Sequence, residues 1–242
     1  MPTLKVCLIC IGVVGCGFGG AQPVGHQAQL AVAEQLIASG QVTQGYRIMD
    51  EVGERQIRSP AVRLDVADSY FKVDALLKAE MLYRDAIAQG AFVKGSVGLG
   101  RVSLARNEAA EARKYFQAAL EKSDDNASAL NGLGVAYDLD GAHAQAQEIY
   151  RRILDADPIN VDALNNYGLS LVLQGSVQTA TRVLTDLTES NLDNPSSRQN
   201  LAIAYFLGGQ QDAAMRLARL DTSEDDAGQL MAAVAAYRKA RS

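Results

Sequence analysis

The side chains that could act as nucleophiles or metal ligands are few, and the thiols among them lie near the N-terminus. All three cysteines, Cys7, Cys10 and Cys16, fall within the first 16 of the 242 residues. No cysteine follows them, so the rest of the sequence has neither the thiols of a disulfide framework nor those of a cysteine-ligated metal site. Any cysteine chemistry is therefore restricted to the N-terminal stretch.

Histidine and carboxylate chemistry is equally sparse. The two histidines, His26 and His143, have no partner at metal-ligand spacing, and we expect His143 to be a solvated side chain at the start of a helix. Asp155 and Asp157 precede Pro158, which is typical of a helix end and not of a calcium-binding loop. Since no catalytic constellation stands out, we expect a protein that is not an enzyme, without a metal, a cofactor or a small-molecule substrate.

The cysteine at position 16 follows a segment with the features of a secretory signal. Lys5 supplies a positive charge, and residues 6–14 are almost wholly apolar. This run is too short to span a bilayer but has the length of a signal-peptide core. It ends in Val-Val-Gly-Cys at residues 13–16. The pattern resembles the lipobox of bacterial lipoproteins, in which an aliphatic residue, a small or aliphatic residue and a small residue precede the cysteine.

This resemblance implies a covalent lipid on Cys16. In that family a diacylglycerol is joined to the thiol, a peptidase cuts before the cysteine, and the new amine is acylated, for example with palmitate. Residues 1–15 would then be a removed signal peptide, and residues 16–25 a flexible lipidated tether. Gly17 stands where an aspartate would retain the protein in the inner membrane, which implies the periplasmic face of the outer membrane. The alternatives are an ordinary cleaved signal peptide or an apolar N-terminus that stays in place.

The composition of the chain favours helices and argues against nucleic-acid binding. Apolar residues make up 48% of the sequence, tryptophan is absent and there are five prolines. This composition favours closely packed helices over strands. The formal net charge is −5 and the pI is about 5.1, so the sequence lacks the basic footprint of a nucleic-acid-binding protein.

A period of about 34 residues runs through the chain from residue 26 onwards. Units that start at residues 26, 60, 93, 127, 161 and 195 have a small residue at their eighth position, where the two helices of a pair would meet. Their fifteenth position, where the first helix would end, holds a residue type that tolerates a left-handed backbone. The eighth positions are Ala33, Ala67, Gly100, Gly134, Gly168 and Ala202, and the fifteenth are Gly40, Asp74, Asn107, Gly141, Gly175 and Gly209.

This pattern resembles the tetratricopeptide repeat (TPR) family. The resemblance predicts an all-α solenoid of five to six helix-turn-helix repeats with a C-terminal capping helix at residues 227–242. The repeats would be 26–59, 60–92, 93–126, 127–160, 161–194 and 195–226, of which 127–160 is close to the consensus and 26–59 is weak.

The resemblance also implies a partner-binding groove lined by the first helix of each repeat. The fifth position places the carboxamides Asn131, Asn165 and Gln199 in three successive units, and each can pair with the backbone of an extended peptide. The alternative is that these residues pack against the adjacent helix or meet water. With their apolar and charged neighbours, the predicted groove residues are Arg101, Asn131, Val135, Asp138, Asn165, Leu169, Val172, Arg198, Gln199, Ile203 and Phe206.

The last unit carries a narrower resemblance. Arg-Gln-Asn-Leu-Ala at 198–202 is followed by Tyr205, Leu-Gly-Gly at 207–209, Ala-Ala at 213–214 and Arg-Leu-Ala at 216–218. Together with the lipobox, this is similar to the TadD family of TPR lipoproteins of the tight-adherence (Tad/Flp) pilus assembly system. It implies an outer-membrane scaffold that binds the secretin or an accessory pilus protein. Alternatives are a pilotin of another secretin system, as in type IV pili, a periplasmic regulator of a cell-wall enzyme, and a soluble adaptor without a lipid.

Overall fold

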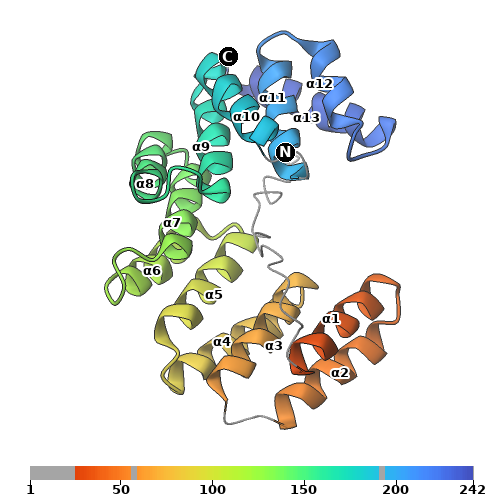
Figure 1. Cartoon of the computed structure of the whole chain (residues 1–242), viewed down its shortest axis with the longest axis vertical. Helices are drawn as coiled ribbons and strands as arrows, with labels where there is room; N and C mark the ends of the chain where they lie inside the picture. Colours follow the sequence, from red (N-terminus) through yellow and green to blue (C-terminus); the bar gives the residue numbers. More distant parts are fainter. Residues whose placement is uncertain (1–24, 56–58, 191–193, 242) are drawn as a thin grey trace. The chain divides into compact units, whose positions relative to one another are not determined.

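The computed structural model describes residues 25–55, 59–190 and 194–241, and this part of the chain consists of α-helices joined by short turns (Figure 1). The predicted all-α repeat fold is confirmed, whereas the predicted signal peptide and Cys16 lie outside the described residues. The described helices are α1 (Gly25–Ala38), α2 (Val42–Arg55), α3 (Pro60–Lys72), α4 (Leu76–Ala88), α5 (Phe92–Ala105), α6 (Ala109–Leu120), α7 (Ala127–Leu139), α8 (His143–Ala156), α9 (Val161–Gln174), α10 (Val177–Ser190), α11 (Pro195–Leu207), α12 (Gln211–Ala218) and α13 (Glu224–Arg241).

The chain divides into two compact units, and the division falls within α7. The first unit ends at Ala136 and holds α1 to α6 and most of α7. The second begins its described part at Tyr137 and holds α8 to α13. Each unit is a separate compact stack of helices.

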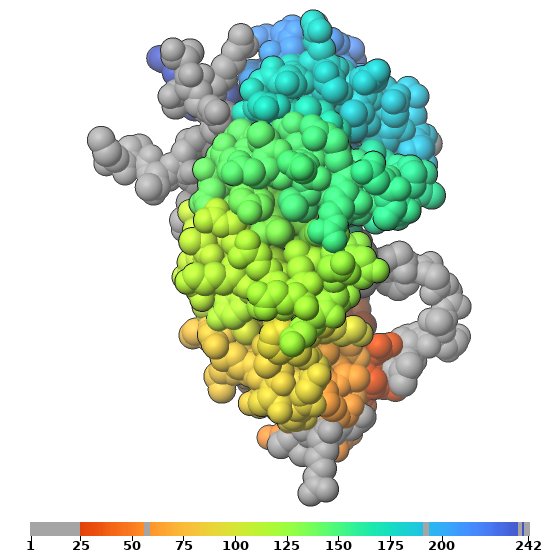
Figure 2. All heavy atoms as spheres, turned by 90° about the vertical axis from the view of Figure 1, so that its left-hand side faces the viewer, coloured from red at the N-terminus to blue at the C-terminus, as the bar shows by residue number. Residues whose placement is uncertain are grey.

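Successive helices pair, and the first helices of successive pairs also contact each other. In the first unit α1 packs on α2, α3 on α4 and α5 on α6, while α3 also contacts both α1 and α5. In the second unit α9 packs on α10 and α11 on α12, while α11 also contacts α9 and α13. The spheres of α4, α5 and α6, orange to yellow-green in Figure 2, meet without a break along one face of the first unit. The first helices thus form a continuous row within each unit.

The turn inside each pair has the backbone that the sequence predicts. The fifteenth position of every unit has a positive φ, between 59° at Asp74 and 96° at Gly175. The next residue donates its backbone N–H to the carbonyl five residues earlier, as Gln41 does to Leu36 over 2.8 Å. This bond satisfies a carbonyl at the helix end, so the turn closes each first helix without a side-chain cap.

Large side chains on the second helices fill the space between the pairs. The twenty-fourth positions, Met49, Tyr83, Phe116, Tyr150 and Leu184, are fully buried. In the first unit the ring of Tyr83 lies so close to Gly98 on α5 that an added Cβ there would be 2.3 Å from it. Phe116 meets Gly132 on α7 in the same way. Glycine on the next first helix is therefore required for the large side chain to fit.

Candidate partner-binding site

The predicted groove residues all lie on first helices, but they fall into two groups. Arg101 on α5 and Asn131 and Val135 on α7 belong to the first unit. The other eight belong to the second unit: Asp138 at the end of α7, Asn165, Leu169 and Val172 on α9, and Arg198, Gln199, Ile203 and Phe206 on α11. The predicted groove residues of each unit lie on first helices of that unit, so each unit has its own set of groove residues.

Burial separates the groove residues into two classes. Val135, Asn165 and Val172 are buried, and the Asp138 side chain is only 7% exposed. These four residues therefore contribute mainly to the packing of the helices. The partly exposed residues that a partner could reach are Arg101, Asn131, Leu169, Arg198, Gln199, Ile203 and Phe206.

The carboxamide of Asn165 is paired inside the second unit. Asn200 on α11 donates its Nδ2 hydrogen to Oδ1 of Asn165 over 3.0 Å, and both residues are buried. Asn200 is the neighbour of Gln199 in the sequence, and Gln199 is partly exposed. Gln199 is therefore the groove carboxamide of this unit that a partner can reach, with Leu169 and Ile203 at the ninth positions of α9 and α11.

Arg198 makes an ion pair across the second unit. Its Nε donates to Oδ2 of Asp221 over 2.7 Å, and its Nη2 donates to Oδ1 of the same carboxylate. A bidentate arginine–carboxylate pair has a fixed geometry. It joins α11 to the segment between α12 and α13, so the guanidinium is held by the fold.

Asp138 lies at the centre of a buried polar cluster. Its Oδ1 accepts a hydrogen bond from Oγ of Ser170 over 2.7 Å and lies 2.8 Å from Nδ1 of His143. Its Oδ2 accepts a hydrogen bond from the hydroxyl of Tyr150 over 3.1 Å. Burial, followed by the proximity of Asp138, raises the pKa of the Tyr150 hydroxyl well above its usual value. The cluster links α7, α8 and α9.

The prediction of a solvated His143 is wrong. Its side chain is 8% exposed, because the turn between α7 and α8 returns it beneath the end of α7, where it meets Asp138. The cluster contains a serine, a histidine and an aspartate, but their arrangement is not that of a catalytic triad. In a triad the serine hydroxyl faces the imidazole, whereas the hydroxyl of Ser170 donates to Asp138. The second ring nitrogen of His143 is buried and has no hydrogen-bond partner in the described part of the chain.

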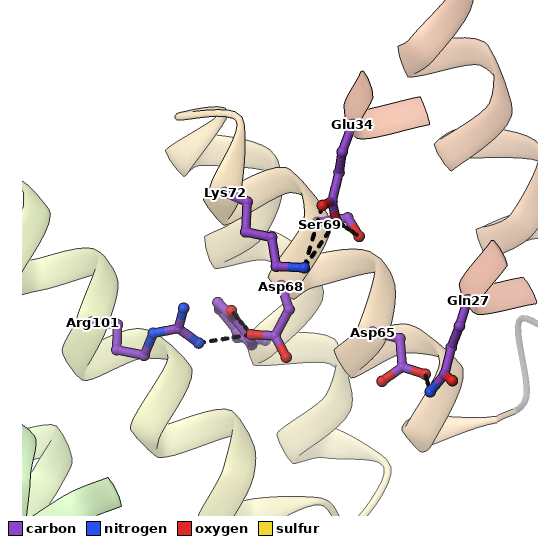
Figure 3. A network of polar contacts seen from close by, with 8 residues as sticks. Gln27, Glu34, Asp65, Asp68, Ser69, Lys72 and Arg101 are labelled. Atoms are coloured by element: carbon purple, nitrogen blue, oxygen red, sulfur yellow. Dashed lines mark hydrogen bonds and ion pairs between the residues drawn. The ribbon is translucent and has the colours of Figure 1, made fainter. Parts of the chain in front are cut away.

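Polar contacts also connect the first helices of the first unit, as Figure 3 shows. Glu34 on α1 accepts a hydrogen bond from Oγ of Ser69 over 2.7 Å and pairs with Nζ of Lys72 at 3.2 Å. One turn earlier on α3, Asp65 accepts a hydrogen bond from Nε2 of Gln27 over 3.3 Å and lies 2.8 Å from Nε2 of His26. Sequence reasoning did not identify this surface.

Arg101, a predicted groove residue, belongs to the same row of contacts. Its Nη1 donates to Oδ1 of Asp68 over 2.8 Å, and its guanidinium lies over the ring of Phe71 at 4.3 Å. The same oxygen of Asp68 accepts from the hydroxyl of Tyr83 over 2.6 Å. The signal that could have identified these contacts is the sequence spacing, since Asp68–Arg101 and Glu34–Ser69 are separated by 33 and 35 residues, about one repeat.

Asp162 is a partly buried carboxyl that sequence reasoning did not single out. It occupies the second position of its unit, in the first turn of α9. Burial raises the pKa of its carboxyl.

No cluster of three potential metal ligands occurs among the residues that the structure describes. Within the same residues, no helix combines the length and the hydropathy that crossing a bilayer requires.

Comparison with known proteins identifies the repeats. A family model described as tetratricopeptide repeat matches residues 97–160 and 141–181. No curated protein matches the sequence. Among solved structures, the chain is similar to a thermophilic TPR protein of Thermus thermophilus, with 17% sequence identity and a TM-score of 0.65. That alignment covers 73% of this chain and 98% of the other.

Two further structures have the same type of fold. A tetratricopeptide repeat protein from Parabacteroides merdae aligns at 14% identity and a TM-score of 0.59, over 79% of this chain and 77% of its own. The APC/C hetero-tetramer Cut9–Hcn1 aligns at 14% identity and a TM-score of 0.65, over 85% of this chain and 42% of that one. At such identities the likeness shows the fold alone, which is a TPR-type solenoid.

Proposed function

We propose that this chain, a solenoid of TPR type, is a non-catalytic scaffold that holds a segment of a partner protein. TPR repeats imply a scaffold for protein–protein interactions. The observation that carries the proposal is the partly exposed strip of the second unit, where Leu169 on α9 and Gln199 and Ile203 on α11 lie on first helices that contact each other. An apolar strip with a carboxamide can bind both the side chains and the backbone of an extended segment.

We propose further that the scaffold is anchored to the periplasmic face of the outer membrane by a lipid on Cys16. The lipobox-like sequence at residues 13–16 and the signal-like run before it support this proposal. Each buried methylene of an acyl chain contributes about 0.8 kcal/mol, and several chains on one cysteine would hold the protein at the membrane.

The client that we propose is the secretin, or an accessory protein, of a tight-adherence pilus system. The support is the similarity of residues 198–218 and of the lipobox to TadD-family lipoproteins. The lipid would fix the height of the solenoid above the membrane, and the groove would hold the client at that height. A pilotin of another secretin system has the same architecture, and a regulator of a cell-wall enzyme is the candidate of a different class.

The experiment that tests this function is a mild-detergent pull-down of the tagged native protein, with co-purifying proteins identified by mass spectrometry. Recovery of a secretin together with Flp-type pilus components is the expected result. Recovery of a type IV pilus secretin would show that the client belongs to that system and not to a tight-adherence pilus. Recovery of cell-wall synthases would contradict the proposed role in pilus assembly. Deletion of the gene separates the same readings, because only the pilus roles predict lost fibres with a normal cell wall.

A further inference from the structure

The last three helices, α11, α12 and α13, are joined to one another by ion pairs and by a small apolar cluster (Figure 1). Arg198 on α11 pairs with both carboxylate oxygens of Asp221, which lies between α12 and α13. Arg219, in the same segment, pairs with Glu224 in the first turn of α13. The buried residues of the cluster are Ala202, Ala214, Ala218, Ala227 and Met231. We call these three helices the C-terminal block.

The core of the C-terminal block consists mainly of small side chains, since four of the five buried residues in its cluster are alanines. The buried cluster of the first unit has fourteen residues, which include Met49, Tyr70 and Tyr83. The twenty-fourth position of the block is Ala218, whereas earlier repeats have large side chains there. Because apolar stabilisation scales with the area removed from water, the block gains less from burial than the helices of the first unit do.

The first helix of the block also buries polar side chains where its equivalent in the first unit buries apolar ones. α3 and α11 have 13 residues each, and both begin with proline. The third position of the repeat is Val62 in α3 and Ser197 in α11, and both residues are buried. Oγ of Ser197 has no hydrogen-bond partner in the described part of the chain. A buried hydroxyl without a partner favours an opened state, in which water can bind it.

The contact between α9 and α11 is weaker in kind than the contacts between other first helices. Asn165 and Asn200 are neutral carboxamides, and Nδ2 of Asn200 donates to Oδ1 of Asn165 over 3.0 Å. Charged groups take part in the corresponding contacts of the other helices, which are Glu34–Lys72 between α1 and α3, Asp68–Arg101 between α3 and α5, and Asp138–Ser170 between α7 and α9. Hydrogen bonds to charged groups are stronger than those between neutral groups. The second unit should therefore separate more readily between α9 and α11 than between α7 and α9.

We propose that the C-terminal block opens reversibly from α9 and α10 as one body, while the first unit stays folded. The apolar cluster at this joint has six buried residues, of which the block contributes Leu201 and Ala204. The opening therefore removes fewer buried apolar residues from their contacts than unfolding of the first unit does. In the opened state Asn165 and Asn200 can each bind water in place of one another. Proteins open locally at less cost than they unfold globally where a boundary has these properties.

The opening divides the strip that we propose as the partner-binding surface. Leu169 lies on α9, whereas Gln199 and Ile203 lie on α11 in the block. A partner segment that contacts both helices binds only the closed state, so its binding stabilises that state. This consequence rests on the proposed function, but the opening itself does not.

Hydrogen exchange of the backbone amides, measured by mass spectrometry on the native protein in mild detergent, tests the opening. The slowest amides of α11 and α12 should exchange at a common rate. After correction for intrinsic rates, this rate should be at least about tenfold higher than the rate of the slowest amides in α3 and α4. Protection of α11 equal to that of α3 would overturn the proposal.

Variants of the carboxamide pair locate the joint. Asn165→Leu together with Asn200→Leu replaces both carboxamides by apolar side chains of similar size, so exchange in α11 and α12 should slow by at least about threefold. Asn200→Ala leaves Asn165 buried without its donor in the closed state and should accelerate the same exchange. Neither change should alter the rates of α3 and α4. Unchanged exchange of the block in either variant would show that it does not open at this joint.

Two further measurements test whether the block moves as one body and whether the opening affects partner binding. Arg198→Gln breaks the ion pair within the block, so α12 should then exchange faster than α11, and equal rates would contradict a block held by this pair. In the complex recovered by the pull-down, exchange of α11 and α12 should slow relative to the free protein, and an unchanged rate would refute the link to partner binding. Failure to recover a complex would count against the proposed function, whereas the opening is measured on the free protein.

Discussion

Asn200 on α11 and Asn165 on α9 form a buried carboxamide pair, in which Nδ2 of Asn200 donates to Oδ1 of Asn165 over 3.0 Å. The two residues are one repeat apart, and α9 and α11 contact each other along the same row. The pair therefore joins consecutive repeats of the second unit through a buried polar contact.

Asn165→Ala should destabilise the second unit by about 1–3 kcal/mol, because the amide of Asn200 would remain buried without its acceptor. The measurement is the urea midpoint of the transition that reports on the second unit, followed by circular dichroism. Changing both residues together should cost less than the sum of the two single changes, since neither partner is then left unpaired. Additive single and double changes would show that the pair contributes nothing.

Gln199→Ala should weaken partner binding while leaving the unfolding midpoint nearly unchanged, because Gln199 is partly exposed and Asn165 is not. A change of about 1 kcal/mol, or about fivefold in Kd, corresponds to the loss of one hydrogen bond. The matched control is Gln178→Ala, which removes an exposed carboxamide from the second helix α10. Equal effects of the two variants on binding to the pulled-down client would show that Gln199 and the first-helix groove do not contribute to binding.

The carboxyl of Glu80 should make the folding stability of the protein depend on pH in the acid range. Hydrogen bonds from Arg84 and then from Arg106 lower the pKa of its carboxyl below 4.5. A lowered folded-state pKa means that the contribution is present above pH 4.5 and is lost as the pH falls through the folded pKa. Glu80→Gln should therefore lower the urea midpoint at pH 7, by under about 1 kcal/mol for so accessible a pair, and the difference from the parent should shrink as the pH falls below 4.5. A difference that stays constant with pH would exclude this mechanism.

The carboxylate of Asp162 should lower the stability at neutral pH, which is the opposite of the effect expected for Glu80. Burial raises the pKa of its carboxyl above 3.8, so the folded state holds the proton to a higher pH than the unfolded state does. The ionised form is then disfavoured by folding, and Asp162→Asn should raise the urea midpoint at neutral pH. The gain should vanish below pH 3.8, where the carboxyl is protonated in both states. A lower midpoint for the variant at neutral pH would contradict the assignment and would indicate that the carboxylate stabilises the N-terminus of α9.

The turns of the solenoid were predictable because their chemistry is local. Asp74 and Asn107 have a left-handed backbone at the position where the other units have glycine, and these residue types tolerate that conformation. Burial at the groove positions was not predictable in the same way. Asn131 is partly exposed and Asn165 is buried although both hold the fifth position, so the position in the repeat does not by itself determine burial.

The position of His143 shows the same limit. Because His143 follows a turn, the sequence predicted that its side chain would be exposed to solvent. In the structure the ring contacts Asp138, which lies five residues before it in the sequence, and Asp138 also accepts a hydrogen bond from Ser170 in the next repeat. The three side chains form a buried polar cluster. A search for complementary polar residues 32 to 39 positions apart would have found the contact between Asp138 and Ser170. It would also have found the contacts that Glu34, Asp65 and Asp68 make with polar residues of the neighbouring repeat.

Cys16→Ala should release the protein from membranes, if the thiol carries the lipid that the lipobox-like sequence implies. The expected cause is the loss of the acyl chains, because each buried methylene contributes about 0.8 kcal/mol to membrane binding. The measurement is sedimentation of membranes from cells that express each variant, with immunodetection in the pellet and the supernatant. Cys10→Ala is the matched control, because it also removes a thiol but lies in the segment that cleavage would remove, and it should leave the protein in the pellet. Continued sedimentation of Cys16→Ala with the membranes, after a high-salt wash that removes bound clients, would show that another feature anchors the protein.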